Sequence, residues 1–475
     1  MRSRLFTLDD QIAFAQLSGD NNPLHIDAVA ARRMLFGQPV VHGIHALLWG
    51  LDCWCKDQGG TLALRSLKAV FSRPLRISDT ASVTLEPGKD GQLGIRLRSG
   101  GTIAIAIDLE WTTSLPQPCD SVRPGDPECI VPRVLSADDI ASDSGILDLY
   151  LNMEAARRLF PNVIRCLPAL QVAVLLSTTR LVGVYCPGRH SIYSELALMS
   201  GVPDDSSAMR YDVGKFDKRI GLASIALTAP GMTGTIKAFQ RPAPQEQAAY
   251  LTMKRQIVSH EFAGQRALII GGSRGLGEVA AKLLAAGGAE TRITYHRGKE
   301  DADRIVDDIR SHGGTADGVQ FDVVNPQLAG LNLATPNRVP THLYYFATPF
   351  IFAGAKGTFS PRLFTRFCDY YVTGFVDIVS QLYELGTRRI FYPSTVAIDE
   401  LPTDMGEYAA AKVAAETLCT FLEKTRRDLG IYRPRLPRVA TDQTASVMPI
   451  TNQDPVPLML ERLRSFRDWS IGSRG

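Results

Sequence analysis

Residues 266–277 read Arg-Ala-Leu-Ile-Ile-Gly-Gly-Ser-Arg-Gly-Leu-Gly, and this stretch decides the fold of the second half of the chain. Its first five residues form a short apolar run typical of a buried strand, and residues 275–286 have the pattern of a helix. The glycines between them permit a tight bend and let the backbone approach a pyrophosphate. Because a helix N-terminus offers free N–H groups and a partial positive charge, the stretch predicts a dinucleotide-binding unit.

Strand and helix signals alternate from this unit toward the end of the chain. Further strands are predicted at 291–296, 342–347 and 388–392, and helices at 301–311, 364–385 and 407–426. This alternation favours an α/β Rossmann fold, a doubly wound parallel sheet, over residues 264–475.

The residues after the second strand indicate which dinucleotide is bound. Residues 295–299 read Tyr-His-Arg-Gly-Lys, with no carboxylate to bind a ribose 2′-hydroxyl. Arg297 and Lys299, together with Arg274 inside the glycine loop, are cations suited to a 2′-phosphate. We therefore expect NADP(H) as the cofactor; the alternative is that Arg297 and Lys299 only solvate a surface loop.

Three side chains further along have the spacing of a carbonyl-reducing site. Ser394 follows the predicted strand 388–392, Tyr408 lies fourteen residues later, and Lys412 comes four residues after it. Positions i and i+4 share one face of a helix, so the ammonium is expected to lower the pKa of the phenol. Tyr408 would donate a proton to a carbonyl oxygen held by Ser394 as a hydride reaches the carbon. A Tyr–Lys pair alone is usually a pair on the surface of a helix. Here the pair follows both the nucleotide loop and the strand that carries the serine, which favours a catalytic role.

With these motifs, residues 264–475 resemble the short-chain dehydrogenase/reductase family. Asp322 and Val323, after the third strand, match the family's adenine-contacting pair, and Arg274 matches a basic residue of its NADP-preferring members. The resemblance implies catalytic roles for Ser394, Tyr408 and Lys412. It also implies a cofactor site of Gly271, Ser273, Arg274, Gly275, Leu276, Gly277, His296, Arg297, Asp322, Val323, Ala347, Tyr408 and Lys412.

The chain departs from that family at three places. Phe346-Ala347-Thr348 stands where the family has Asn-Ala-Gly, Tyr371 stands where many relatives have a catalytic asparagine, and Pro437-Arg438 replaces a Pro-Gly. These changes affect the proton relay and the nicotinamide side of the site.

A second constellation lies near the N-terminus, where residues 18–27 read Ser-Gly-Asp-Asn-Asn-Pro-Leu-His-Ile-Asp. Asp20 and His25 are placed to bracket a water, and such a carboxylate–imidazole pair supplies the base and the acid that hydration of an enoyl thioester needs. Gly43 follows Val40-Val41-His42 and opens a helix-like run, so its N–H can meet a thioester oxygen as enolate charge builds. The competing interpretation is that Asp20 and Asn22 only form a turn that His25 caps.

This pattern looks like the (R)-specific enoyl-CoA hydratases, the MaoC-like proteins of the α+β hot-dog fold, over about residues 5–112. The resemblance also includes Phe71-Ser72-Arg73-Pro74 and Asp79. It implies that Asp20 and His25 are the catalytic dyad, that Asn22 and Pro23 shape the loop, and that Gly43 is the oxyanion donor. A serine that some relatives carry on the central helix is not evident; Leu51 is near that position.

The chain as a whole is predicted to be multidomain. A hot-dog unit is expected at 1–115, a proline-rich linker at 114–133, a degenerate second hot-dog unit at 134–240, a connector at 241–263, and the reductase at 264–475. The second unit repeats the order helix then strands, with an apolar helix near 164–176, and would complete a double hot-dog. It has no Asp-x-Asn-Pro-x-His motif, and its His190 is expected to be a core or surface histidine.

Composition excludes several classes of protein. The chain has 475 residues, a formal net charge of +3 and eight scattered cysteines, without a run long enough to span a membrane. We expect a cytoplasmic homo-oligomer with reduced thiols, no secretory signal, no metal site, and no nucleic-acid or membrane partner.

The two resemblances imply successive steps on one acyl thioester, carried by CoA or an acyl carrier protein. The hypothesis is a bifunctional enzyme that reduces a 3-oxoacyl thioester with NADPH and interconverts the (R)-3-hydroxyacyl and enoyl forms. The alternatives are a reductase of another carbonyl, such as a nucleotide sugar or a polyketide, with an inert hot-dog module for dimerisation or acyl binding, and a non-enzymatic NADP-binding protein.

Overall fold

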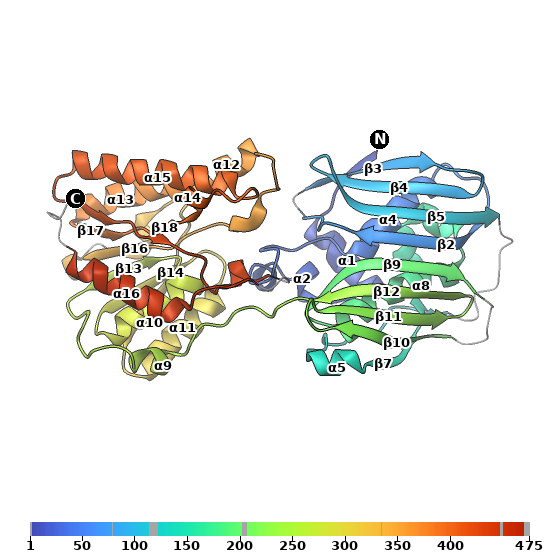
Figure 1. The fold of residues 1–475 in the computed structure, drawn as a ribbon, viewed down its shortest axis with the longest axis horizontal. Helices are drawn as coiled ribbons and strands as arrows, with labels where there is room; N and C mark the ends of the chain where they lie inside the picture. Colours follow the sequence, from blue (N-terminus) through green and yellow to red (C-terminus); the bar gives the residue numbers. More distant parts are fainter. Residues whose placement is uncertain are drawn as a thin grey trace. The chain divides into compact units, whose positions relative to one another are not determined.

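The computed structural model describes residues 2–77, 79–113, 122–201, 207–333, 335–446 and 450–469. It contains two compact units, one built on Met1–Ala243 and the other on Pro244–Ala445 and Ile450–Gly475 (Figure 1). The predicted boundary at 115 and residues 114–121 of the predicted linker lie outside the described residues. Among the described helices, none is both long enough and apolar enough to cross a membrane.

The first unit contains one antiparallel sheet of ten strands. Antiparallel pairing of β2 with β9 joins its two halves, with Leu67 opposite Leu198. The order across the sheet is β1(Arg2–Leu5), β3(Thr80–Pro87), β4(Gln92–Ser99), β5(Thr102–Thr113), β2(Leu62–Phe71), β9(Ser191–Ser200), β12(Met232–Gln240), β11(Leu222–Ala229), β10(Ala208–Asp217) and β7(Ser144–Asp148). The predicted first and second segments therefore share one sheet.

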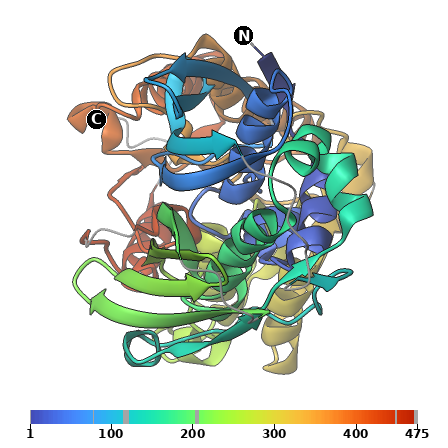
Figure 2. The same cartoon turned by 90° about the vertical axis from the view of Figure 1, so that its right-hand side faces the viewer.

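Two apolar helices form the core of this unit, and the sheet curves around them (Figure 2). They are α4(Gly43–Cys55) and α8(Ala169–Arg180), and both are buried over nearly all their length, although the last turn of α8 is polar. A π-helical turn, η1(Leu181–Tyr185), continues α8. The shorter helices are α1(Leu8–Ser18), α2(Pro23–Ile26), α3(Ala28–Ala31), α5(Ala137–Ala141), α6(Met153–Leu159) and α7(Pro161–Cys166).

Some sequence expectations for this unit were wrong in detail. The helix expected at 164–176 is two helices, α7 and α8, because Pro168 has no N–H to continue the first one. The predicted linker is not wholly irregular, since β6(Arg123–Pro124) pairs with β8(Tyr150–Leu151).

The second unit confirms the predicted parallel α/β sheet. The strand order is β15(Thr315–Gln320), β14(Glu290–Tyr295), β13(Arg266–Ile270), β16(His342–Tyr345), β17(Arg389–Phe391) and β19(Gly430–Tyr432), and every pair is parallel. In chain order this reads 3-2-1-4-5-6, the arrangement that binds dinucleotides where the order reverses, next to β13.

Most helices of this unit connect successive strands, while the first precedes β13 and the last follows β19. They are α9(Tyr250–Lys254), α10(Gly275–Ala286), α11(Lys299–Ser311), α12(Pro361–Cys368), α13(Gly374–Leu385), α14(Ala397–Glu400), α15(Gly406–Thr425) and α16(Pro455–Asp468). The long helix expected at 364–385 is α12 and α13 joined by a π-helical turn, η5(Asp369–Thr373). Beyond β17, β18(Ser394–Thr395) pairs with β20(Arg435–Leu436).

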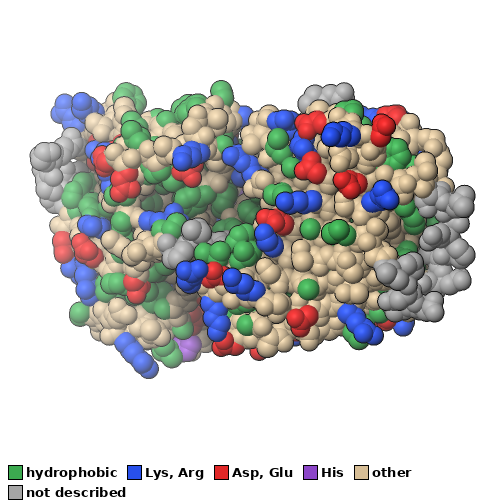
Figure 3. All heavy atoms as spheres, turned by 45° about the vertical axis from the view of Figure 1, so that its right-hand side comes forward, with side chains coloured by type: hydrophobic (Ala, Val, Ile, Leu, Met, Phe, Trp, Pro, Cys, Tyr) green, Lys and Arg blue, Asp and Glu red, His purple; other side chains and the backbone are tan. Residues whose placement is uncertain are grey.

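Charge on the surface is mixed rather than gathered. On the face of the first unit seen in Figure 3, Lys and Arg side chains alternate with Asp and Glu. The described cysteines are free thiols, at 53, 55, 129, 166, 186, 368 and 419.

Candidate functional site

Local capping places the N-terminal motif. Helix α1 ends at Gly19, which adopts the left-handed conformation that a C-cap requires. Asn22 then caps α2, its Oδ1 accepting from Leu24 N at 3.1 Å, and Pro23 is the first helical residue. The Asn22 Nδ2 donates to the carbonyl oxygens of Gly183 at 3.0 Å and Arg189 at 3.2 Å. The loop that carries Asp20 is therefore tied to the second half of the unit.

The Asp20 carboxyl group is buried, with 2% of the residue exposed. Its Oδ2 accepts a hydrogen bond of 2.6 Å from Thr179 Oγ1, a residue that the sequence analysis did not select. Burial raises the pKa of Asp20 to about 7, although the Thr179 hydroxyl and the backbone N–H of Asn22 act in the opposite direction. Asp20 can therefore gain or lose a proton near neutral pH.

His25 is held as a base. Its Nδ1 lies 2.8 Å from the carbonyl oxygen of Val40, which can only accept, so Nδ1 carries the proton and Nε2 has a free lone pair. Burial lowers the pKa of His25 to about 4. At neutral pH His25 is thus an uncharged imidazole.

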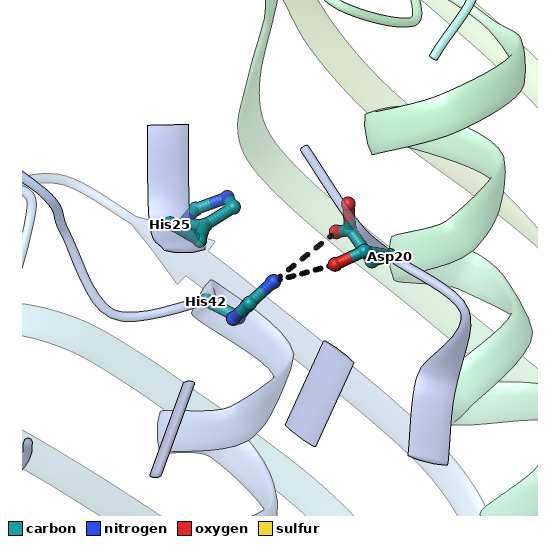
Figure 4. A group of neighbouring side chains, drawn as sticks. All are labelled: Asp20, His25 and His42. Carbon is teal, nitrogen blue, oxygen red and sulfur yellow. Dashed lines mark hydrogen bonds and ion pairs between the residues drawn. The ribbon is translucent and has the colours of Figure 1, made fainter. Parts of the chain in front are cut away.

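His42 joins this pair, although the sequence analysis gave it no role. Its ring stacks on that of His25, with 3.9 Å between the centroids and 26° between the planes. Its Nε2 lies 2.9 Å from the Asp20 carbonyl oxygen and 4.0 Å from Asp20 Oδ2, and its Nδ1 lies 3.0 Å from Gln11 Oε1 (Figure 4). Burial and the neighbouring His25 lower the pKa of His42, and a neutral ring donates only one of these hydrogen bonds. In the sequence, the His-Gly pair at 42–43 was the feature that could have indicated a role for His42.

Asp20, His25 and His42 have the ligand types of a metal centre, and their ligand atoms lie within 4.8 Å of one another. The two imidazole planes are nearly parallel, so their nitrogen lone pairs do not converge on a common point. The Nε2 of His42 is also directed at a carbonyl oxygen. This arrangement suits proton transfer better than cation binding.

Asp20 and His25 line a cavity of about 270 Å³. Gly43 lines it at the first position of α4, where its backbone N–H has no partner within the helix. A Cβ at Gly43 would stand 2.9 Å from the Phe71 ring, so a larger residue would crowd the cavity wall. The second half of the unit also contributes to the lining, with Thr179, Val182, Gly183, Ser191, Ile192, Tyr193, Ser194 and Phe239.

Two other residues considered in the sequence lie apart from this chemistry. Leu51 is buried in the core, and no hydroxyl occupies its position. His190 is partly buried and does not line the cavity, which agrees with a non-catalytic histidine.

In the second unit the glycine loop lies between β13 and α10, as predicted. Gly271 has a φ of +80°, and a Cβ there would lie 2.7 Å from the Ala347 backbone nitrogen. A Cβ on Gly277 would lie 2.2 Å from the Gly271 carbonyl oxygen. These close approaches require glycine at both positions. The loop leads directly into the N-terminus of α10, which begins with Gly275 and Leu276. Ser273 is buried in this loop.

The predicted cations differ in their surroundings. Lys299 Nζ is bound at 2.6 Å to Asp303 on its own helix, and Arg274 Nη1 lies 3.9 Å from Asp442. His296 Nδ1 lies 3.7 Å from Asp322, next to the buried Val323. Arg297 is exposed on the loop after β14. Of the two loop cations, Arg297 is therefore better placed than Lys299 to meet a phosphate.

The prediction for Ser394 was wrong in its geometry. Its hydroxyl donates to Glu416 Oε1 at 2.5 Å, and the hydroxyl that lowers the pKa of Tyr408 is that of Thr395. Successive residues of a strand point to opposite faces, and Ser394 and Thr395 are both in β18. Thr395, not Ser394, is therefore the hydroxyl beside the phenol.

Lys412 is not among the groups that shift the pKa of Tyr408. Burial raises the pKa of Tyr408 to about 12, and the group that lowers it is Thr395. Lys412 Nζ donates to the Pro393 carbonyl oxygen at 2.8 Å and lies 4.1 Å from the centre of the Tyr371 ring. Burial lowers the pKa of Lys412 to about 7, so this side chain is only partly protonated at neutral pH.

Tyr371 occupies the middle of this cluster. Its ring packs edge-on against Tyr408 at 5.8 Å, and its hydroxyl is hydrogen-bonded to Thr348. The other departure, Arg438, donates to Asn452 Oδ1 at 2.9 Å and to the Thr444 carbonyl oxygen at 2.7 Å. Both unusual residues thus have structural partners of their own.

Comparison with known proteins agrees with the two halves. The family described as MaoC like domain matches residues 2–98, and the family described as short chain dehydrogenase matches residues 265–330. A versicolorin reductase of Emericella nidulans is 35% identical over 68 residues, which is 14% of this chain and 26% of that protein. A 3-oxoacyl-[acyl-carrier-protein] reductase of Synechocystis sp. is 41% identical over 64 residues, 14% of this chain and 26% of that protein. The match therefore spans about a quarter of these relatives.

Solved structures similar to the chain include a short chain dehydrogenase from Burkholderia cenocepacia in complex with NADP. It is 22% identical, covers 43% of this chain and 91% of that one, and has a TM-score of 0.37. The angucycline C-6 ketoreductase LanV with bound NADP is 22% identical, covers 39% of this chain and 76% of that one, and has a TM-score of 0.35. The two family matches, not these structures, identify a MaoC-like domain at the N-terminus and a short-chain dehydrogenase domain later in the sequence.

Proposed function

We propose that the protein is a bifunctional acyl-thioester enzyme, with an enoyl hydratase site in the first unit and an NADPH-dependent 3-oxoacyl reductase site in the second. The observation that carries the proposal is the pairing of Asp20 and His25 beside Gly43 in the lining of one cavity. The joined ten-stranded sheet with two central helices supports a double hot-dog fold for the first unit. A cytoplasmic homo-oligomer acting on thioesters of CoA or acyl carrier protein fits this function.

In the hydratase site, His25 and Asp20 have complementary protonation states. The His25 Nε2 lone pair takes a proton from water as its oxygen adds to the β carbon of the enoyl thioester. The Asp20 carboxyl group, which titrates near pH 7, gives its proton to the α carbon. The Gly43 N–H stabilises the enolate oxygen between these events. In dehydration the protons move in reverse, and the family resemblance gives the (R) configuration.

The glycine loop suits a dinucleotide, because Gly271 and Gly277 allow the tight turn and the close helix–strand packing of such sites, and the loop leads into the N-terminus of α10. The α10 N-terminus and Arg274 would hold the phosphates of NADP(H), and Arg297 would meet the 2′-phosphate. His296, Asp322, Val323 and Ala347 would surround the rest of the cofactor. NADPH supplies the hydride when bound.

In the reductase site, Tyr408 would give its phenolic proton to the carbonyl oxygen of the substrate. Thr395 takes the place first assigned to Ser394, and its hydroxyl holds the same oxygen. Lys412 would support the phenolate by its positive charge once the site is filled, since an opposite charge nearby favours the ionised form.

A second candidate is a reductase of another carbonyl with a hot-dog module that only binds acyl groups or dimerises. Two observations favour it. Relatives include a versicolorin reductase and a probable tetrahydroxynaphthalene reductase of Zymoseptoria tritici, 42% identical over 60 residues, which is 13% of this chain and 22% of that protein. Tyr371 and Arg438 also depart from the family pattern.

An assay of NADPH oxidation separates the two candidates. The protein is offered short and medium 3-oxoacyl thioesters and, separately, aromatic polyketide-type ketones. We expect oxidation with the thioesters. Oxidation with the ketones alone would remove the thioester assignment and leave the second candidate.

A further inference from the structure

We propose that the second half of the first unit completes the hydratase site: Thr179 and Gly183 form the seat of the Asp20 carboxyl group, and Thr179 is a positioning residue that fixes its direction and favours its ionised form. This inference deepens the proposed hydratase function and rests on it. It assigns a role to a half of the unit that lacks the Asp-x-Asn-Pro-x-His motif.

The hydroxyl of Thr179 is directed at the carboxylate. Thr179 lies in the last turn of α8 and is 3% exposed. Its Oγ1 is 2.6 Å from Asp20 Oδ2, and because an ionised carboxylate can only accept, the hydroxyl is the donor. Hydrogen bonds to a charged group in a buried site are about twice as strong as neutral ones. The contact therefore favours the ionised form and fixes the direction of the carboxylate.

Gly183 makes the space for this arrangement. It lies in the π-helical turn η1, where a Cβ would stand 2.0 Å from Asp20 Oδ1 and 2.5 Å from Asp20 Cγ. No side chain larger than hydrogen fits there unless Asp20 moves. The Gly183 carbonyl oxygen also accepts from Asn22 Nδ2 at 3.0 Å, so one turn holds both ends of the Asp20–Asn22 segment. Single π-helical turns within α-helices are often found at functional sites.

The titratable groups around the carboxylate come from three elements. His42 at the start of α4 lies 4.0 Å from Oδ2, and His25 on α2 lies within 4.8 Å. Arg180 follows Thr179 on α8, but its guanidinium is hydrogen-bonded to the Asp148 carbonyl oxygen and Ser177 Oγ. Burial alone raises the pKa of Asp20, and the Thr179 hydroxyl is the largest influence that opposes it. Loss of this hydroxyl should therefore raise the pKa further.

The first test is the pH profile of hydration in the full-length protein, because hydration requires protonated Asp20 and neutral His25. For Thr179→Val we expect the basic limb, which reports ionisation of Asp20, to move up by roughly one to two pH units. Thr179→Ser should restore the wild-type profile. The matched control is Thr178→Val, which removes a neighbouring buried hydroxyl that donates to the Leu175 carbonyl oxygen; its limb should not move. A Thr179→Val profile that is lower but unshifted would overturn the proposal.

The second test does not need hydratase activity. The pKa of Asp20 is higher in the folded protein than its usual 3.8, so the folded state binds the proton more tightly. The contribution of Asp20 to stability is therefore lost as pH rises from about 4 to about 7. In Thr179→Val this loss should continue to higher pH, and in the Thr179→Val, Asp20→Asn double variant it should disappear. Thermal midpoints that run parallel with pH in wild type and Thr179→Val would contradict the proposal.

These readouts separate two kinds of failure. A wild-type protein that neither hydrates nor dehydrates thioesters would remove the proposed function, while the unfolding midpoints would still report whether Thr179 sets the titration of Asp20. Gly183→Ala provides an independent check, since the added methyl group should displace the carboxylate. We expect it to lower kcat more than it changes KM. An unchanged kcat would contradict the proposal that Gly183 makes space for the Asp20 carboxyl group.

Discussion

The sites of the two units were both predicted from short motifs. The structure brings the predicted residues together in the first unit but only in part in the second. In the first, Asp20, His25 and Gly43 all line one cavity. In the second, the predicted serine points away, and the hydroxyl of its neighbour Thr395 lowers the pKa of Tyr408. The first motif lies in a loop and two helix starts, and the Asn22 cap fixes the first of these helices, α2. The second includes a strand, where a shift by one residue reverses the face.

The largest effect on activity should come from replacing Asp20 or His25, and it should separate the hydratase activity from the reductase activity. Asp20→Asn or His25→Ala should lower hydratase activity roughly 10²–10⁴-fold, the usual contribution of general acid–base groups, and leave NADPH oxidation unchanged. Both rates are measured on the same preparation. Equal loss of both activities would mean that the variant is misfolded, and no loss of hydratase activity would favour an inert hot-dog module.

The reverse experiment tests the second site. Tyr408→Phe should lower reductase activity by a similar roughly 10²–10⁴-fold, because the phenol is the proton donor, and should spare the hydratase. Steady-state NADPH oxidation measures it. A variant that keeps most of its reductase activity would remove Tyr408 from the chemistry.

Variants of Ser394 and Thr395 test which of the two hydroxyl groups of β18 acts in the reductase site. Thr395→Val should lower reductase kcat roughly 10²–10³-fold, as loss of an oxyanion donor does. Ser394→Ala should keep kcat within about threefold, although loss of its bond to Glu416 can cost about 1 kcal/mol of stability. The opposite ranking of the two variants would restore the original assignment of Ser394.

The smallest effect concerns cofactor choice. Arg297→Ala should raise KM for NADPH about tenfold, since a hydrogen bond to a charged group contributes roughly 1.5 kcal/mol, and should leave KM for NADH unchanged. The matched control is Lys299→Ala, because Lys299 is already paired with Asp303. A larger effect from Lys299 than from Arg297 would show that the wrong cation had been chosen.

Local features could be predicted well. The glycine loop, the strand before it and the alternation that gives the parallel sheet follow from patterns a few residues long, and the structure confirms them. The Asp20–His25 motif also follows from a single turn and its caps. The predicted domain boundaries remain predictions, although the first two segments share one sheet.

What the sequence could not provide was contact over long separations. Thr179 is 159 positions from Asp20, and no motif connects them. Gln11, which meets His42, is 31 positions away. The side-chain partner of Ser394 is Glu416, one turn after Lys412, and burial rather than the nearby lysine determines the pKa of Tyr408. Such partners depend on how the helices and strands pack, so they appear only with the fold.

One measurement tests the central claim most directly: a 3-oxoacyl thioester and NADPH are incubated with the protein, and the products are followed by mass analysis. We expect wild type to give a mixture of 3-hydroxyacyl and enoyl thioesters, Asp20→Asn to stop at the 3-hydroxyacyl thioester, and Tyr408→Phe to leave the 3-oxoacyl thioester. Wild-type reduction that ends at the 3-hydroxyacyl thioester with no loss of water would contradict the account.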